Sequence, residues 1–208
     1  EKAQEFDASG KKQGITFDTQ LKLAKTTPSA NQETIDIVTG NAGNDSITGN
    51  DEDNIISGGD GNDTIFGEGG DTGDTLLGNQ GDDYIATKGA NFNIVDAGEG
   101  NDTIIAEATS FDQKQLLDGG SGSDIIYGSE SSDYIIAGAD KFESGTSVNL
   151  ISANGGNDII WSNDGQNELQ GGAGDDIYFV NLAQSSAYIW DIQGNDTLFV
   201  TNANPYWS

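Results

Sequence analysis

The stretch that decides the fold is residues 58–66, Gly-Gly-Asp-Gly-Asn-Asp-Thr-Ile-Phe. It carries glycine at positions one, two and four, aspartate at position six and an aliphatic residue at position eight. The first six residues predict a tight turn, because glycine adopts the positive φ angles that such a turn requires. The last three predict a short strand whose middle side chain, Ile65, points inward.

The same nine-residue frame recurs from residue 40 to residue 179, and most copies keep the sixth-position aspartate. Long insertions follow Ala106 and Ala137, and the copy over residues 67–77 is two residues too long. A fixed period is typical of solenoids, in which each unit stacks on its neighbours. Turn propensity alone imposes no period, so aspartates that serve only as turn residues are the weaker interpretation.

The sixth-position aspartates and nearby glycines form a candidate set of metal ligands. Ca²⁺ takes six to eight oxygens at about 2.3–2.6 Å, more than one turn supplies, so the ion is expected between stacked turns. The predicted aspartates are Asp45, Asp63, Asp74, Asp83, Asp102, Asp124, Asp133, Asp158 and Asp176. The predicted glycines are Gly40, Gly43, Gly58, Gly61, Gly78, Gly81, Gly98, Gly100, Gly119, Gly122, Gly171 and Gly174.

This G-G-x-G-x-D-x-U-x repeat, in which U is a large aliphatic residue, resembles the RTX (repeats-in-toxin) calcium-binding family of bacterial proteins. The resemblance implies an all-β fold, a right-handed parallel β-roll (a β-solenoid), in which two nonapeptides make one coil. The expected domains are an N-terminal linker or cap over residues 1–34, the β-roll over 35–180 and a C-terminal cap over 181–208.

Repeats two apart in such a roll stack on the same side, so the sixth positions divide into two series. One series is Asp45, Asp63, Asp83, Asp102 and Asp124; the other runs through Asn54, Asp74 and Phe92 and ends with Asp133, Asp158 and Asp176. Six neighbouring pairs of aspartates result, so about six Ca²⁺ ions are expected. Asn54, Phe92 and Asn167 are expected to be spacers that bind no ion. The later pairs depend on the phase of the roll across the insertion after Ala137.

The eighth positions predict one thin core. They are Ile47, Ile56, Ile65, Leu76, Ile85, Ile94, Ile104, Leu116, Ile126, Ile135, Leu150, Ile160, Leu169 and Tyr178. The ninth positions would face outward and form an apolar stripe on one side: Leu77, Val95, Leu117, Ile136, Trp161 and Phe179. Such a stripe is unusual on a soluble monomer. We expect either that the N-terminal segment, the insertions or the C-terminal strands cover it, or that it binds a partner or a second copy.

Outside the repeats, alternating residues predict short strands at 14–18 and 21–23 and a first strand of the roll at 35–38. Two longer strands, at 186–192 and 195–200, are expected to flank a turn at Gly194 and to cover the open end of the roll.

Composition narrows the function. The chain has 35 acidic and 8 basic residues, a net charge of -27, which opposes compaction and makes nucleic acid an improbable partner. Cysteine, histidine and arginine are absent, which removes disulfides and the usual zinc and imidazole chemistry. The chain also lacks G-x-S-x-G and H-E-x-x-H motifs, so we do not expect an enzyme.

The resemblance implies a calcium-folded module of a secreted, extracellular bacterial protein, located outside the cell or on its surface. The partners it implies are calcium, the type I secretion machinery and a catalytic or toxin domain upstream in a longer chain. The alternative is an adhesin-type or surface-layer module that binds a surface or a glycan through exposed aromatics such as Tyr127, Tyr134, Trp161 and Trp190.

Overall fold

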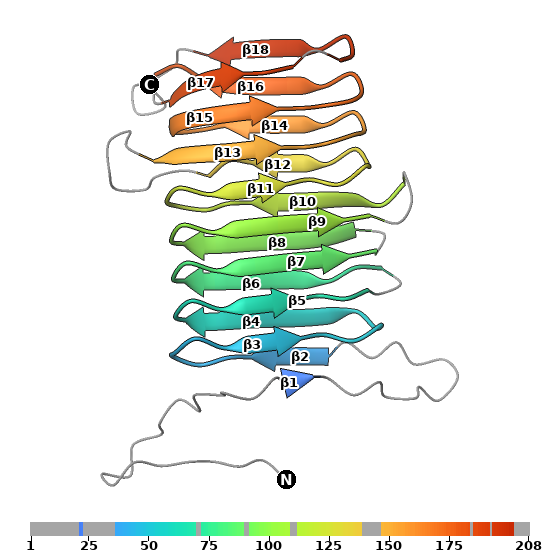
Figure 1. Ribbon diagram of the computed structural model, residues 1–208, viewed down its shortest axis with the longest axis vertical. Helices are drawn as coiled ribbons and strands as arrows, with labels where there is room; N and C mark the ends of the chain where they lie inside the picture. The colour runs from blue at the N-terminus through green and yellow to red at the C-terminus, as the bar shows by residue number, and fades with distance from the viewer. Residues whose placement is uncertain are drawn as a thin grey trace, which may run out of the picture.

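The computed structural model describes residues 21–22, 36–69, 72–89, 92–108, 112–138, 147–183, 185–191 and 193–201. Within these ranges the chain forms strands and turns, and no helix is long and apolar enough to cross a membrane. The strands make two nine-stranded sheets, and every pairing is between parallel strands. Figure 1 shows the strands stacked in one column, blue at the N-terminal end and red at the C-terminal end.

Successive strands alternate between the two sheets, so one strand from each sheet makes a coil. The first sheet contains β1 (Leu21–Lys22), β3 (Ser46–Thr48), β5 (Thr64–Phe66), β7 (Tyr84–Lys88), β9 (Thr103–Glu107), β11 (Ile125–Tyr127), β13 (Val148–Ser152), β15 (Gly165–Gln170) and β17 (Ser185–Ile189). The second contains β2 (Asp36–Thr39), β4 (Asn54–Asp60), β6 (Thr75–Gln80), β8 (Phe92–Glu99), β10 (Lys114–Asp118), β12 (Tyr134–Ile136), β14 (Ile159–Ser162), β16 (Ile177–Asn181) and β18 (Thr197–Thr201). The predicted all-β parallel β-roll is confirmed.

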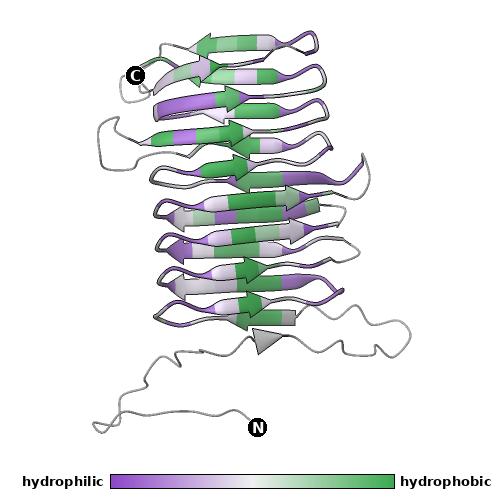
Figure 2. Cartoon of the chain, in the orientation of Figure 1, coloured by the Kyte–Doolittle hydropathy of each residue, from purple (hydrophilic) through white to green (hydrophobic). Residues whose placement is uncertain are grey.

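The core is a column of buried, mostly aliphatic side chains between the sheets; most described strands contribute one of them, and β8, β9 and β16 contribute two each. Ile56, Ile65 and Leu76 are fully buried, and the column ends at Tyr178 and Val180. Burial of each such side chain contributes about 1.5–3 kcal/mol. Figure 2 shows the resulting pattern, with apolar residues along the strands and hydrophilic residues at the turns.

At three places the prediction of the core residue is wrong, because the next residue in the sequence fills the core instead. Ile94 and Leu150 are exposed and Leu116 is half-buried, whereas Val95, Leu117 and Ile151 fill the core. The pairing of Leu76 with Val95, and of Val95 with Leu117, fixes this register. The extra residues of these repeats therefore lie in the turns before the strands, because a slip within a strand would turn its apolar side chains outward.

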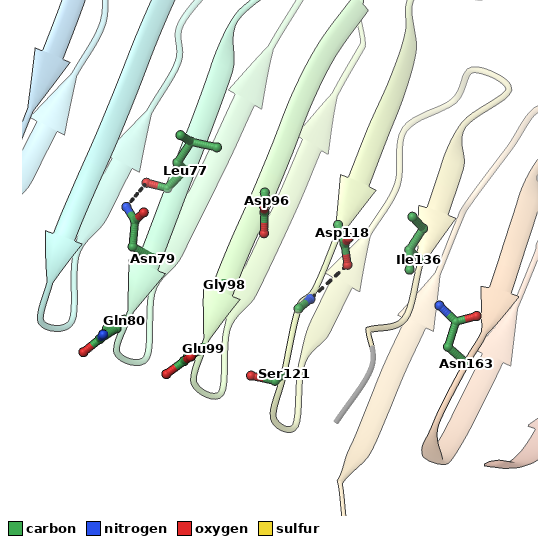
Figure 3. A pocket seen from close by; sticks show the side chains of 11 residues that line it. Leu77, Asn79, Gln80, Asp96, Gly98, Glu99, Asp118, Ser121, Ile136 and Asn163 are labelled. Atoms are coloured by element: carbon green, nitrogen blue, oxygen red, sulfur yellow. Dashed lines mark hydrogen bonds between the residues drawn. The ribbon is translucent and has the colours of Figure 1, made fainter. Parts of the chain in front are cut away.

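The predicted six-residue apolar stripe is also wrong, because Val95 and Leu117 belong to the core. Their places on the outer face of the second sheet are taken by Asp96 and Asp118, which pair with each other between Leu77 and Ile136. Figure 3 shows these acidic side chains on neighbouring strands, along a shallow hollow of that face. These two acidic residues thus interrupt the predicted stripe, and its apolar residues are continuous only from Ile136 to Phe179.

In the C-terminal part of the second sheet, aromatic rings stack from coil to coil. The ring centroids of Trp161 and Phe179 lie 5.2 Å apart, and those of Phe179 and Phe199 lie 5.0 Å apart. Such offset stacking adds about 0.5–1.5 kcal/mol per pair beyond the burial of area. The aromatic stack therefore ties the last described coil to the two before it.

The ends of the roll differ partly from the prediction. The first strand of the roll and a two-residue strand at Leu21–Lys22 are present, whereas the segment 14–18 lies outside the described residues. The two C-terminal strands are present as β17 and β18, but they pair in parallel with β15 and β16. They extend the roll by one more coil, and Leu198 in the last strand remains 52% exposed.

Candidate metal sites

The sixth-position side chains form two rows that run along the roll, one beside each sheet. The first row contains Asp45, Asp63, Asp83, Asp102, Asp124, Asn149 and Asn167. The second row contains Asn54, Asp74, Asn93, Gln115, Asp133, Asp158, Asp176 and Asp196. The structure thus brings the six predicted pairs of aspartates together, and the insertion after Ala137 leaves the second row in phase.

Most neighbours in a row are joined by the same hydrogen bond, from the backbone N–H of one residue to the side-chain Oδ1 of the next, whereas Asn149 donates to Oδ1 of Asn167 through its side-chain Nδ2. The distances are 2.7 Å from Asp45 to Asp63, 2.7 Å from Asp63 to Asp83 and 2.7 Å from Asp83 to Asp102. These bonds satisfy buried backbone donors and use one oxygen of each carboxylate. They also fix where the second oxygen points.

That second oxygen is buried and has no hydrogen-bond partner in most of these aspartates. The oxygens concerned are Oδ1 of Asp45 and Oδ2 of Asp63, Asp74, Asp83, Asp102, Asp158 and Asp176. An unsatisfied buried polar group costs about 1–3 kcal/mol, and more when it is charged. Oxygens of this kind, repeated on successive coils, fit a hard divalent cation, which binds carboxylate and carbonyl oxygens.

The predicted glycines shape the space around these oxygens in two ways. First-position glycines lie against the carboxylate: a Cβ at Gly58 would overlap Oδ2 of Asp63. Fourth-position glycines lie against the previous coil: Gly61 has φ of +126°, and a Cβ there would overlap the carbonyl of Gly43. Substitution would therefore fill the space beside the carboxylates or push the coils apart.

Burial raises the pKa of seven of the row aspartates above their usual value of 3.8. Loss of solvation is the largest cause, backbone N–H donors oppose it, and neighbouring carboxylates add to it. The pKa rises to about 6 for Asp74, Asp83, Asp133 and Asp176, about 7 for Asp102 and about 8 for Asp158, and that of Asp63 is also raised. The folded chain thus concentrates carboxylates that resist ionisation unless a cation compensates them.

Asp133 differs from the seven aspartates that have an unpartnered oxygen, because both of its own oxygens have protein partners. Oδ1 accepts from the backbone N–H of Gln115 at 2.9 Å, and Oδ2 accepts from the N–H and hydroxyl of Ser129 at 2.7 and 2.8 Å. Its repeat has serines where the motif has glycines. Ser129 therefore supplies part of what an ion would supply elsewhere.

Asparagine or glutamine takes the place of aspartate at the remaining positions of both rows, and the rows stay continuous. Asn54 and Asn167 occupy the sixth position as predicted, but Phe92 does not: Asn93 holds that place and accepts from the Asp74 N–H at 2.8 Å. Phe92 is exposed, because the extra residue of this repeat lies in the turn. An amide oxygen thus replaces the carboxylate as the acceptor but brings no charge.

Sequence reasoning missed two features of the site. The fifth positions form a second set of hydrogen bonds, in which the side chains of Asn44, Asn62 and Asp82 accept from the next coil's backbone. The last turn also repeats the motif in altered form, since Gly194 and Asp196 stack on Gly174 and Asp176. The G-x-D spacing of residues 194–196 was the available signal for the second feature.

The aromatic candidates do not share one face. Tyr127 and Trp190 are 40% and 58% exposed and line a groove over the first sheet. Tyr134 and Trp161 lie on β12 and β14 of the second sheet and are half-buried. A surface made from all four residues is therefore ruled out by the fold.

Parallel coils with stacked, incompletely satisfied aspartates define a calcium-binding β-roll. The family model for the RTX calcium-binding nonapeptide repeat, which spans four copies, matches residues 33–65, 68–87, 89–108, 115–141 and 144–179. The chain therefore belongs to the RTX calcium-binding repeat family. The comparison with curated proteins gave no match.

Proposed function

We propose that this chain is a calcium-folded module of a secreted bacterial protein, which crosses the cell envelope by a type I system and folds outside. The observation that supports the proposal is the series of buried carboxylate oxygens without partners, at residues such as Asp63, Asp83 and Asp102. The ion would be held between neighbouring aspartates of a row. Its role would be structural, because it would turn unfavourable buried charge into ligands.

The energetics support a calcium-dependent switch. Without an ion, the net charge of -27 and the buried carboxylates both oppose the folded state. Because stacked turns do not exist in the unfolded chain, the free energy of ion binding becomes free energy of folding. Extracellular calcium modules bind at about 10⁻⁴–10⁻³ M, so such a chain stays unfolded in the cytosol and folds after export.

A calcium titration of the full chain tests this proposal. Far-UV circular dichroism is followed as calcium is added, then as a chelator removes it, with magnesium as the control ion. We expect a cooperative and reversible coil-to-β transition with calcium alone, because magnesium requires near-ideal octahedral geometry and keeps its waters. A stable β spectrum in chelator would overturn the proposal and leave a solenoid that folds without metal.

A glycan-binding role is a second candidate, and the groove over β11, β13, β15 and β17 favours it. Tyr127 and Trp190 line this groove of about 680 Å³, together with the polar residues Ser152, Glu168 and Gln170. Aromatic faces beside polar side chains suit the apolar faces and hydroxyls of a neutral sugar. The acidic chain disfavours anionic polysaccharides.

Glycan binding is tested with the calcium-loaded chain on an array of neutral and charged glycans. Trp190→Ala should abolish retention, and Trp161→Ala, on the opposite sheet, is the matched control. Equal retention of the two variants would place binding elsewhere, and no retention of the native chain would exclude this role.

A further inference from the structure

We propose that Asp176, Asp191 and Asp196 form a calcium site at the C-terminal end of the roll that differs from the repeat sites. Three carboxylates would bind one ion at this site, whereas each repeat site offers only the two carboxylates of neighbouring aspartates in a row. The proposal rests on the proposed function, because it requires a roll that folds with calcium. It adds a ligand, Asp191, that the repeat motif does not contain.

The three carboxylates converge from two consecutive turns. One oxygen from each lies within 4.8 Å of the other two. Asp176 and Asp196 are neighbours in the second row, joined by a 3.0 Å hydrogen bond from the Asp176 N–H to Oδ1 of Asp196. Asp191 begins the last turn, at the motif position that Gly171 occupies one coil earlier.

A buried oxygen faces this cluster. Asp176 is 1% exposed, its Oδ1 accepts from the Asp158 N–H at 2.7 Å, and its Oδ2 has no partner. A Cβ placed on Gly171 would overlap both this Oδ2 and the Tyr178 hydroxyl, so the two atoms border the same small space. The Tyr178 hydroxyl in turn donates to Oδ2 of Asp191, which places the unpartnered oxygen beside that carboxylate.

Tyr178 acts as a positioning residue for Asp191. The other strands of the roll fill this core position with aliphatic side chains, whereas here a hydroxyl reaches the edge of the core. It accepts from the Gly171 N–H at 2.6 Å and donates to the Asp191 carboxylate. Both bonds fix its direction, so Asp191 is held over the buried oxygen of Asp176.

Charge makes this cluster the best calcium site of the roll. Carboxylates this close repel one another in the absence of a cation. Calcium affinity rises with the number of charged ligands and with the rigidity of the site. The three-carboxylate site should therefore hold its ion more tightly than the sites that two aspartates form.

The location gives the ion a mechanical role. The side chains of Leu198 and Val200 in β18 are 52% and 51% exposed, so apart from the stacking of Phe199 on Phe179 packing restrains this last strand weakly. An ion bound by Asp176 and Asp196 would join β18 to β16 through their turns. The site would thus fasten the last described coil to the body of the roll.

The test compares Asp191→Asn with Asp175→Asn in the full chain. Asp175 is an exposed acid one residue before Asp176, and its Oδ1 accepts from the Asn195 N–H at 2.9 Å, a bond that asparagine retains. Calcium stoichiometry and affinity are measured by calorimetry, and hydrogen exchange of residues 197–201 is measured at saturating calcium. We expect Asp191→Asn to lose the tightest binding step, because Asp176 and Asp196 alone form a two-carboxylate site like those of the repeats, and to show faster exchange in β18, whereas Asp175→Asn keeps both properties.

Tyr178→Phe provides a second variant, which keeps all three carboxylates and the aromatic ring. It should weaken the tightest binding step while the number of ions stays the same. If Asp191→Asn binds as many ions as the native chain with unchanged affinities, this site is excluded while calcium-driven folding stands. If the native chain binds no calcium, the proposed function fails as well.

Discussion

The backbone N–H of Asp63 donates a 2.7 Å hydrogen bond to Oδ1 of Asp83, 20 residues later in the chain. The same carboxylate that would bind an ion through Oδ2 therefore already joins two coils through Oδ1. Folding and ion binding use different atoms of one side chain. The two contributions can be separated by replacing aspartate with asparagine, which keeps the acceptor and removes the charge.

Asp83→Asn should keep the row intact but lose the ions shared with Asp63 and Asp102. Asn93 shows that an amide oxygen accepts the same bond, from the Asp74 N–H. We expect two fewer ions by calorimetry and a calcium midpoint for folding raised on the order of tenfold, because ligand charge sets calcium affinity. Asp82→Asn, an exposed neighbour that serves as an acceptor for Asn101, is the control. Equal ion counts in the two variants would contradict the site assignment.

Asn93→Asp should create a site. Asn93 lies beside Asp74 in the second row, and its Nδ2 is buried without a partner. Aspartate would remove this donor and place two carboxylates on adjacent coils. We expect one additional ion and a roll that is less stable without calcium, because another charge is buried. Asn62→Asp, on the exposed side of a turn, should leave the ion count unchanged.

The pH dependence of stability should reverse when calcium is added. Without calcium, aspartates whose folded pKa is raised from 3.8 to between about 6 and about 8 stabilise the fold fully below pH 3.8. This contribution is lost as pH rises through the folded values. With saturating calcium, stability should instead rise over this range, because the ion binds the ionised form. The β content of the calcium-stripped chain, followed by far-UV circular dichroism from pH 4 upward, and urea unfolding of the calcium-loaded chain over the same range measure the two trends; trends of the same sign would contradict the ligand role.

Gly59→Ala should destabilise the calcium-loaded roll even at saturating calcium. Gly59 has φ of +120°, and a Cβ would overlap the carbonyl oxygen of Asn41 in the previous coil. Backbone strain and steric overlap together should cost about 3 kcal/mol or more in chemical denaturation. Gly69→Ala is the matched control, because its nearest neighbour would lie 3.4 Å from the new Cβ. Similar losses at both positions would mean that the turns relax easily.

The repeated nonapeptide predicts the period, and its resemblance to the RTX family predicts the parallel roll and the pairing of the aspartates. It does not predict where an extra residue is accommodated. Phe92 and Asn93 are both plausible at the sixth position from local sequence alone. Only the pairing of Val95 with Leu76 and Leu117 decides between them, and that pairing is a contact between distant repeats.

The turn before β18 was not predicted from the sequence as a copy of the repeat, for a related reason. Asp191 stands where the motif has glycine, so the segment from residue 191 to residue 199 matches the repeat only in part. Its assignment depends on β18 pairing with β16, which places Asp196 beside Asp176. The stripe of apolar ninth positions failed with the same register error, since Asp96 and Asp118 occupy its centre.

Pairs of aspartates from one row or the other bridge neighbouring coils along the roll, except at one place. Among the described coils from Asp45 to Asp196, the exception is the junction that lies between Asp124 and Asp133 in the chain. There Asp124 is bonded to Asn149 in the first row, and Gln115 is bonded to Asp133 in the second row. Strand pairing, the aliphatic column and the hydrogen bonds of the two rows hold that junction, but no ion bound between two aspartates would reinforce it. Under a pulling force, or with calcium in short supply, the roll should part there into two blocks that each stay folded. This junction would therefore limit how far tension or partial unfolding spreads along the roll.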